Sequence, residues 1–339
     1  MEKIKIWTVG EVTKLFRITK SKPTLLRDEA NGVIPKATRV QRGTSFVRAW
    51  TKADLPEIGK VHGFLKPPKK TKIIAVYTAK GGVLKTTISY NFARILALNG
   101  IKTLVVGLDV QCSVTDLLTV VPEVESIEDI SSLRPPAGLY EASKHATDGG
   151  IPIESVIQKS DLSTLHFIPE SISLNLLDQK IRDEKRREYF IARLLEPIKD
   201  KYDVIIFDNA PSWNFLIQNS LVAADSVISP VGCDIGTYKS ISQNIGIINN
   251  YRREMELNWS NFILIPTLLE KSKISAQIEA QYRTMYPELI TTQSIRRAIK
   301  GQESILNGAS IIETDPTSTI AGDYFDTISE VWDRISGAK

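Results

Sequence analysis

The sequence predicts an α/β protein whose main part is a doubly wound, mostly parallel sheet. Two observations support this prediction. Short apolar runs, such as Ile73 to Tyr77 and Lys102 to Leu108, recur along the chain as buried parallel strands do. Segments with helical periodicity separate these runs, and helices that alternate with strands cover both faces of a parallel sheet. A small N-terminal domain of different composition precedes the sheet.

The expected strands, in chain order, are 73–77, 102–108, 164–169, 202–207, 226–230 and 262–266. The expected helices are 85–98, 173–200, 236–256, 275–285 and 318–335. Acidic residues and the pair Pro135-Pro136 predict a surface excursion between residues 119 and 163, to which we assign no chemistry.

Charge divides the chain into two parts. Residues 1–72 carry 17 Lys and Arg against 6 Asp and Glu, whereas residues 73–339 carry 26 against 33. Two domains with different partners are expected, and the basic one is small. A secretion signal and a membrane-length apolar run are both missing, so a cytoplasmic protein is expected. Cys112 and Cys233 have no metal-site spacing, and we interpret both as buried apolar residues.

A glycine-rich segment after the first strand of the sheet predicts a phosphate site. The strand runs into Thr78 to Gly82, and a helix begins at Lys85. Backbone N–H groups of such a loop point at anionic oxygens, Lys85 supplies positive charge, and the Thr86 hydroxyl can bind Mg²⁺. The alternative is an ordinary glycine turn, but two lysines at this spacing have no packing role.

The segment Lys80 to Thr87 resembles the deviant Walker A motif of the ParA/MinD family, K-G-G-x-G-K-[ST]-[ST]. The generic pattern G-x-x-x-x-G-K-[ST] fails, because its glycines would fall on Ala79 and Leu84. The resemblance extends over roughly residues 72 to 335 in the order of elements. It implies a P-loop NTPase fold, and it implies that Lys80 reaches the phosphates of the partner subunit across a dimer interface. The implied nucleotide-binding residues are Lys80, Gly81, Gly82, Val83, Leu84, Lys85, Thr86 and Thr87, with Lys80 and Lys85 also catalytic.

Leu84 stands where the family has a glycine. A leucine with φ > 0 would cost about 1–2 kcal/mol, so we expect a negative φ and a side chain that points away from the phosphates. Gly81 and Gly82 remain for close backbone approaches. Leu84 would then cover the nucleotide loop or touch the partner subunit.

Asp109 follows the second strand, where a carboxylate can hold metal-bound water or orient the attacking water. The family reads D-x-D-P-Q here, whereas this chain has Gly107 for the first Asp and Val110 for the Pro. The resemblance assigns the catalytic role, and a place near the metal, to Asp109. A helix N-cap ahead of Leu117 is the alternative reading of this residue.

Asp208 ends the strand that begins near Tyr202. An apolar strand that delivers one carboxylate to its C-terminal end is what a Walker B element requires, because Mg²⁺ needs an oxygen ligand beside the threonine of the phosphate loop. The family pattern D-x-[IV]-[IV]-[IV]-D-x-[PA]-P supports this reading and implies a switch that senses the γ-phosphate in the residues after Asp208. The expected metal-site residues are Thr86, Asp109 and Asp208.

The basic N-terminal part resembles the winged helix-turn-helix of MerR-type regulators. A helix from Thr8, a second helix from Thr19 to Ala30 and an alternating hairpin from Val40 to Trp50 follow in that order. The resemblance implies a DNA-binding domain of residues 1–65, a linker of residues 66–72 and an ATPase domain of residues 73–339. The alternative is a small helical dimerisation arm with merely solvated charges. The expected DNA-binding residues are Lys20, Lys22, Arg27, Arg39, Arg42 and Arg48.

Basic residues recur in the last third of the chain, on helices whose other faces are apolar. In the family such residues form a non-specific DNA surface, although solubilising charges are an equally good reading of any single one. The residues assigned to this surface are Arg252, Arg253, Lys271, Lys273, Arg296 and Arg297.

The resemblance implies a partition ATPase with ATP and Mg²⁺ as cofactors. Two subunits would sandwich two ATP molecules and bind nucleoid DNA, and a ParB-like centromere-binding partner would stimulate an otherwise weak hydrolysis. The N-terminal domain would add operator binding and autoregulation. The alternative is a nucleotide-switched DNA-binding regulator with little turnover, which Leu84, Gly107 and Val110 keep open. A MinD-like membrane role is disfavoured, because the C-terminal segment around Asp323 to Asp333 is acidic.

Overall fold

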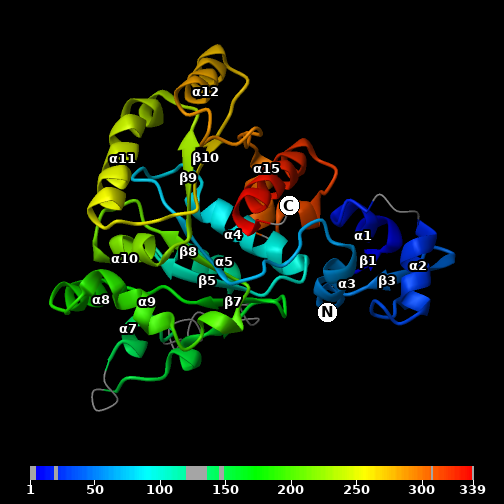
Figure 1. Cartoon of the computed structure of the whole chain (residues 1–339). Coiled ribbons are helices and arrows are strands. Elements are labelled where there is room, and N and C mark those ends of the chain that lie inside the picture. Colours follow the sequence, from blue (N-terminus) through cyan, green and yellow to red (C-terminus); the bar gives the residue numbers. More distant parts are fainter. Residues whose placement is uncertain (1–4, 19–21, 120–135, 145–148, 307, 338–339) are drawn as a thin grey trace, which may run out of the picture.

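The central sheet organises the computed structural model, and a small N-terminal domain packs beside it (Figure 1). The structure describes residues 5–18, 22–119, 136–144, 149–306 and 308–337. The sheet has seven strands in the order β10-β9-β4-β8-β5-β7-β6, and only the β6–β7 pair is antiparallel. The mostly parallel, doubly wound sheet that the sequence predicts is confirmed. The strands are β4 (Lys72–Val76), β5 (Thr103–Leu108), β6 (Gln158–Lys159), β7 (Leu165–Ile168), β8 (Val204–Asn209), β9 (Ser226–Gly232) and β10 (Asn261–Thr267).

Helices cover both faces of the sheet. One face carries α4 (Lys85–Leu98), α5 (Ser113–Leu118), α13 (Ile299–Leu306), α14 (Ile311–Thr314) and α15 (Thr319–Ser336). The opposite face carries α7 (Leu139–Ala142), α8 (Leu174–Arg182), α9 (Phe190–Leu195), α10 (Phe215–Ala223), α11 (Ile235–Glu254) and α12 (Lys273–Met285).

Alternate residues of each inner strand supply the two cores. Ile74 and Val76 of β4 pack on the α4 side, whereas Ile73 and Ala75 pack on the other side. Because successive side chains of a strand point to opposite faces, a strand covered twice must be apolar throughout. This is why the inner strands appear in the sequence as continuous apolar runs.

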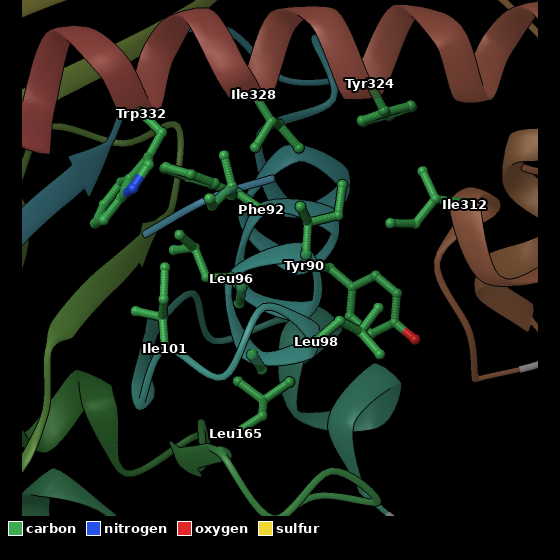
Figure 2. Packing of buried hydrophobic residues seen from close by; sticks show 14 of the residues in the cluster. Tyr90, Phe92, Leu96, Leu98, Ile101, Leu165, Ile312, Tyr324, Ile328 and Trp332 are labelled. Atoms are coloured by element: carbon green, nitrogen blue, oxygen red, sulfur yellow. The ribbon is translucent and has the colours of Figure 1, made fainter. Parts of the chain in front are cut away.

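Helix α4 is buried on almost every side. Figure 2 shows Trp332, Ile328 and Tyr324 of α15 pointing toward Phe92 and Leu96 of α4. The rings of Phe92 and Trp332 meet edge to face, with centroids 6.2 Å apart. A helix so enclosed is fixed along its length, and its first residue is Lys85 of the phosphate loop.

One predicted helix is wrong. Residues 173–200 form α8, a short 3-10 segment (Arg187–Tyr189), α9 and a second 3-10 segment (Lys199–Lys201) instead of one long helix. Arg186 has φ +52, a left-handed conformation that stops α-helical hydrogen bonding. The charged centre of the segment, residues 182 to 187, therefore lies at the connection between α8 and α9.

The N-terminal region is small and contains helical segments and a sheet of its own. It contains β1 (Trp7–Thr8), α1 (Val9–Leu15), α2 (Lys22–Ala30), β2 (Thr38–Arg42), β3 (Ser45–Trp50), a 3-10 turn (Lys52–Asp54) and α3 (Leu55–His62). The strands form an antiparallel sheet in the order β1-β3-β2. The Thr8 side chain and Glu11 make a capping box that starts α1, and Trp50 Nε1 donates to Pro35 O at 2.7 Å.

The N-terminal domain shares one continuous apolar core with α4 and α15. Val12, Leu15 and Phe16 belong to the same cluster as Leu98 and Trp332. Helix α3 approaches the end of α4 so closely that a Cβ on Gly59 would lie 1.8 Å from Leu98 O. Only glycine allows this contact.

Polar contacts reinforce the same interface. Arg94 of α4 is 1% exposed and donates to Glu313 and to Asp161, each at 2.7 Å, while Lys52 donates to Asp161 at 2.6 Å. Trp332 Nε1 donates to Lys66 O at 2.9 Å, inside the segment predicted to be a linker. The small domain is therefore packed against the end of α4.

Candidate active site

The phosphate loop joins β4 to α4, as the sequence predicts. Gly82 has φ +75 and exposes its backbone, which suits close approach by a ligand. Thr267 Oγ1 donates to Val83 O at 3.2 Å and so ties the loop to the end of β10. The N–H groups of the first turn of α4 have no side-chain cap, because Leu84 is the N-cap residue. They remain donors for an anion.

The expected conformation of Leu84 is wrong. Its φ is +68 and its ψ is 27, so the leucine occupies the left-handed region that glycine prefers. Its side chain is half-buried and packs on the core that surrounds α4. This packing compensates for a backbone strain of about 1–2 kcal/mol.

Lys85 lies inside the loop. Its side chain is buried and its ammonium donates to Lys80 O at 2.8 Å. Burial lowers the pKa of Lys85, while the nearby Asp208 and Asp109 carboxylates raise it. A buried ammonium at the start of α4, bonded to one peptide oxygen, is well placed to receive an anion.

Asp208 fits a magnesium site. The carboxyl is fully buried at the end of β8, and its Oδ1 accepts from Ser89 Oγ at 2.7 Å. Its Oδ2 has no hydrogen-bond partner among the described residues. Burial raises the pKa of Asp208 to about 6, against the lowering effect of Ser89, Thr86 and Lys85. A buried carboxylate oxygen without a partner, beside a threonine hydroxyl, is a site for a metal or its water.

Asp109 lies near Asp208 and Lys85, as the resemblance implies, but it is not a helix cap. The N-cap of α5 is Cys112, with φ +57, and Asp109 Oδ1 accepts from Gln111 N at 3.0 Å. Cys112 is half-exposed, so its expected burial is wrong, whereas Cys233 is buried. Asp109 itself is half-buried, and its charge acts on Lys85 of the phosphate loop.

Sequence reasoning missed Glu170. This residue follows β7, is 1% exposed, and accepts hydrogen bonds from the backbone of Asp109 and from the first turn of α5. Burial and the charge of Asp208 raise the pKa of Glu170 to about 8, although the backbone donors of Thr115 and Asp109 oppose the shift. A glutamate that interrupts an otherwise apolar strand end was the only signal available in the sequence.

Lys80 and several exposed apolar residues follow strands at the carboxyl edge of the sheet. Lys80 is exposed, and its ammonium lies 4.0 Å from where a Cβ on Gly236 would stand. The exposed residues Ile172, Trp213, Ile235 and Ile274 follow strands β7, β8, β9 and β10 in turn. Trp213 contacts Tyr77 in a tilted arrangement and Tyr251 edge to face, with ring centroids 5.9 and 5.3 Å away.

A cavity of about 350 Å³ opens beside the phosphate loop. Gly82, Leu84 and Thr87 form one wall, and Leu268 and Tyr324 form part of another. Arg296 also lines it, and its guanidinium is held by the buried Asp323 through bonds of 2.8 and 2.5 Å. The cavity has mixed polar and apolar walls and continues from the loop that would hold phosphates.

The predicted DNA-binding residues fall into distinct surroundings. Arg39 and Arg42 are exposed on β2, Arg27 is exposed on α2, and Arg48 on β3 lies 3.4 Å from Glu29. Lys20 and the side chain of Lys22 lie outside the described residues.

In the last third of the chain, Arg252 donates to Leu257 O and Trp259 O, and Arg297 pairs with Glu270 at 2.8 Å. Arg253 donates to Asn250, while Lys271 and Lys273 are exposed near the start of α12. Arg252, Arg253, Arg296 and Arg297 therefore have partners within the chain, although all but Arg252 are exposed, as are Lys271 and Lys273. Among the described residues, no helix is both long and apolar enough to span a bilayer.

Comparisons with known proteins agree with this geometry. The family described as AAA domain matches residues 71–261. The sporulation initiation inhibitor protein Soj of Bacillus subtilis is 28% identical over 261 residues, which cover 77% of this chain and 98% of that protein. The chromosome-partitioning ATPase Soj of Treponema pallidum is 26% identical, over 77% of this chain and 96% of that protein.

A solved structure has the same fold. The putative plasmid partition protein of Borrelia burgdorferi B31, bound to AMPPNP, aligns with a TM-score of 0.62 at 23% identity. The alignment covers 79% of this chain and 100% of that protein.

Proposed function

This chain belongs to the AAA domain family and is a ParA/MinD-type ATPase, and on that premise we propose that it segregates DNA. The observation that carries the proposal is the convergence of Lys85, Asp109 and Asp208 at one edge of the sheet, with Lys80 exposed beside them. ATP binds in the phosphate loop, and its base enters the adjoining cavity. The relatives whose names describe chromosome or plasmid partition support this proposal.

Each residue of the site has a chemical role in this proposal. Lys85 and the N–H groups of the loop bind the phosphates, and Thr86 and Asp208 hold the magnesium ion or its water. Bound Mg²⁺ supplies neutralisation of the phosphate charge. Asp109 orients the attacking water, because it is the remaining carboxylate near Lys85 that is open to the loop.

The active form is a homodimer. Lys80 is exposed at the carboxyl edge of the sheet and crosses to the second copy, and the exposed residues Ile172, Trp213, Ile235 and Ile274 follow four strands at that edge and offer apolar surface for the contact. Arg253, Lys271, Lys273 and Arg297 bind DNA through charge, and a ParB-like partner stimulates hydrolysis. The N-terminal domain binds an operator with Arg27, Arg39, Arg42 and Arg48.

The second candidate is a regulator in which nucleotide is a switch and turnover is low. The strained Leu84 and the shared core between the N-terminal domain and α4 favour it, because they couple a DNA-binding domain to the nucleotide loop.

One experiment separates the two functions. DNA co-sedimentation is measured without nucleotide, with ADP and with ATP, on a random duplex and on the chain's own promoter, together with the ATPase rate. If the protein is a partition ATPase, it should bind the random duplex only with ATP, and DNA and the partner should raise its ATPase rate. Nucleotide-independent binding to the promoter with negligible turnover would overturn it in favour of the regulator. Lys85→Ala serves as the nucleotide-free control.

A further inference from the structure

Glu170 is hydrogen-bonded to both ends of the segment that carries Asp109. Its Oε1 accepts from Asp109 N at 3.2 Å, and its Oε2 accepts from Val114 N at 3.1 Å and Thr115 N at 3.2 Å. The Thr115 hydroxyl donates to the same Oε2 at 3.3 Å, and Glu170 N donates to that hydroxyl at 2.7 Å. One carboxyl therefore closes the loop from residue 109 to residue 115.

Gly107 makes room for this carboxyl. A Cβ on Gly107 would lie 2.1 Å from Glu170 Cγ and 2.6 Å from Glu170 Oε1. Gly107 lies in the extended strand β5 without a positive φ, so its backbone does not itself require glycine. The glycine is explained by the space that the glutamate fills, and the two residues act as one unit.

The unit lies at the centre of the site. Gly107 pairs in register with Asp208 on the neighbouring strand β8, and Glu170 follows β7 on the other side of β5. The carboxyl reaches the Asp109 segment from outside that segment's own sequence. It thereby determines where the Asp109 peptide, and with it the Asp109 carboxylate, stands relative to Lys85.

We propose that Glu170, accommodated by Gly107, is a positioning residue for ATP hydrolysis that fixes Asp109 without contacting the nucleotide. The proposal rests on the ATPase function proposed above. A misplacement of about 1 Å in a reacting group can lower a rate by about 10²-fold. Because the hydrogen bonds of Glu170 go to Asp109, Val114 and Thr115, loss of its carboxyl should reduce kcat and leave ATP binding intact.

Glu170→Gln is the first test. The amide keeps the size of the side chain. Both carboxyl oxygens of Glu170 accept from backbone N–H groups, so in either orientation the amide NH₂ of glutamine would face a donor and lose that hydrogen bond. We expect kcat to fall about tenfold to 10²-fold, with the Kd for ATP within about threefold of wild type. Glu279→Gln, which removes a carboxylate paired with Arg283 on α12, is the matched control and keeps the wild-type rate.

The second test moves the carboxyl to the neighbouring strand. Glu170→Ala removes it, and Gly107→Asp combined with Glu170→Ala returns one to the same space from β5. We expect the double variant to recover at least about tenfold of the kcat lost in Glu170→Ala, while the Kd for ATP and the thermal unfolding temperature of the two variants stay alike.

Three outcomes are decisive. A folded Glu170→Gln with kcat within twofold of wild type overturns the proposal, as does a double variant no faster than Glu170→Ala. An equal loss of ATP affinity and kcat would show that Glu170 supports binding instead, and overturns it too. If the wild-type chain itself fails to hydrolyse ATP with its partner and DNA, the proposed function falls on separate grounds.

Discussion

Two loops of the active site are built in opposite ways. The phosphate loop contains its own binding groups, Gly82 and Lys85, with the buried helix α4 directly behind it, and Thr267 of β10 ties it in place through Val83 O. The Asp109 loop is shaped from outside, because Glu170, 61 residues away, receives its backbone N–H groups. The comparison teaches that the groups of one loop can be adjacent in the sequence while a second loop beside it is held by a carboxyl from a distant strand.

The largest expected effect concerns the phosphate loop itself. Lys85→Ala should abolish nucleotide binding, since it removes the only buried ammonium described beside the loop. Lys80→Ala should leave ADP binding intact and remove ATP-dependent dimerisation, because Lys80 is exposed at the carboxyl edge of the sheet. Equilibrium nucleotide titration and size measurement of both variants check this. Equal loss of ADP affinity in the two variants contradicts a role for Lys80 across the dimer.

The second largest effect is expected in the Asp109 loop. Asp109→Ala should lower kcat by about 10²-fold or more and trap an ATP-bound dimer on DNA, because it leaves the phosphate loop untouched. Sedimentation with DNA and ATP, beside a turnover assay, measures both results. Hydrolysis at the wild-type rate would mean that the catalytic carboxylate is another residue.

A matched pair of threonines tests the division directly. Thr267→Val removes the hydrogen bond to Val83 O and should weaken ATP binding, whereas Thr115→Val removes the hydroxyl that contacts Glu170 and should lower kcat. Each change costs about 1–3 kcal/mol if a buried partner is left unsatisfied. Steady-state kinetics with ATP titration separates the two effects. If both variants changed the Kd for ATP and kcat in the same way, the proposed difference between the two loops would be wrong.

The smallest effect is expected at Leu84. Glycine there relieves about 1–2 kcal/mol of strain, but it loses the packing of a half-buried leucine and gains flexibility in the unfolded chain. Leu84→Gly should therefore shift the free energy of unfolding by less than about 1 kcal/mol and the Kd for ATP by less than about threefold. Thermal unfolding and nucleotide titration provide the measurement. A tenfold gain in affinity would show that the strain acts on the bound loop.

The sequence predicted what local spacing determines. Strands with both faces covered appear as apolar runs, so the parallel sheet followed from Ile73 to Tyr77 and its counterparts. The phosphate loop and the carboxylate of Asp208 followed in the same way, since both lie at the ends of such strands.

The missed features depend on contacts between distant residues or on single backbone angles. Glu170 gains its role from Gly107 and Thr115, which no spacing rule connects to it. Arg186 and Leu84 adopt positive φ against their residue type, so neither the break in the 173–200 helix nor the loop conformation could be predicted.

Helix α4 connects the phosphate loop to the N-terminal domain. Its 14 residues span about 21 Å at 1.5 Å per residue, from Lys85 in the phosphate loop to Leu98 against Gly59 of the N-terminal domain. If the small domain binds DNA as proposed and nucleotide binding displaces α4, the affinity of the small domain for DNA changes by some factor. Thermodynamic linkage then requires the same DNA to change the nucleotide affinity by that same factor. A promoter fragment would act as an effector of the nucleotide site, and one titration in each direction would measure a single coupling free energy.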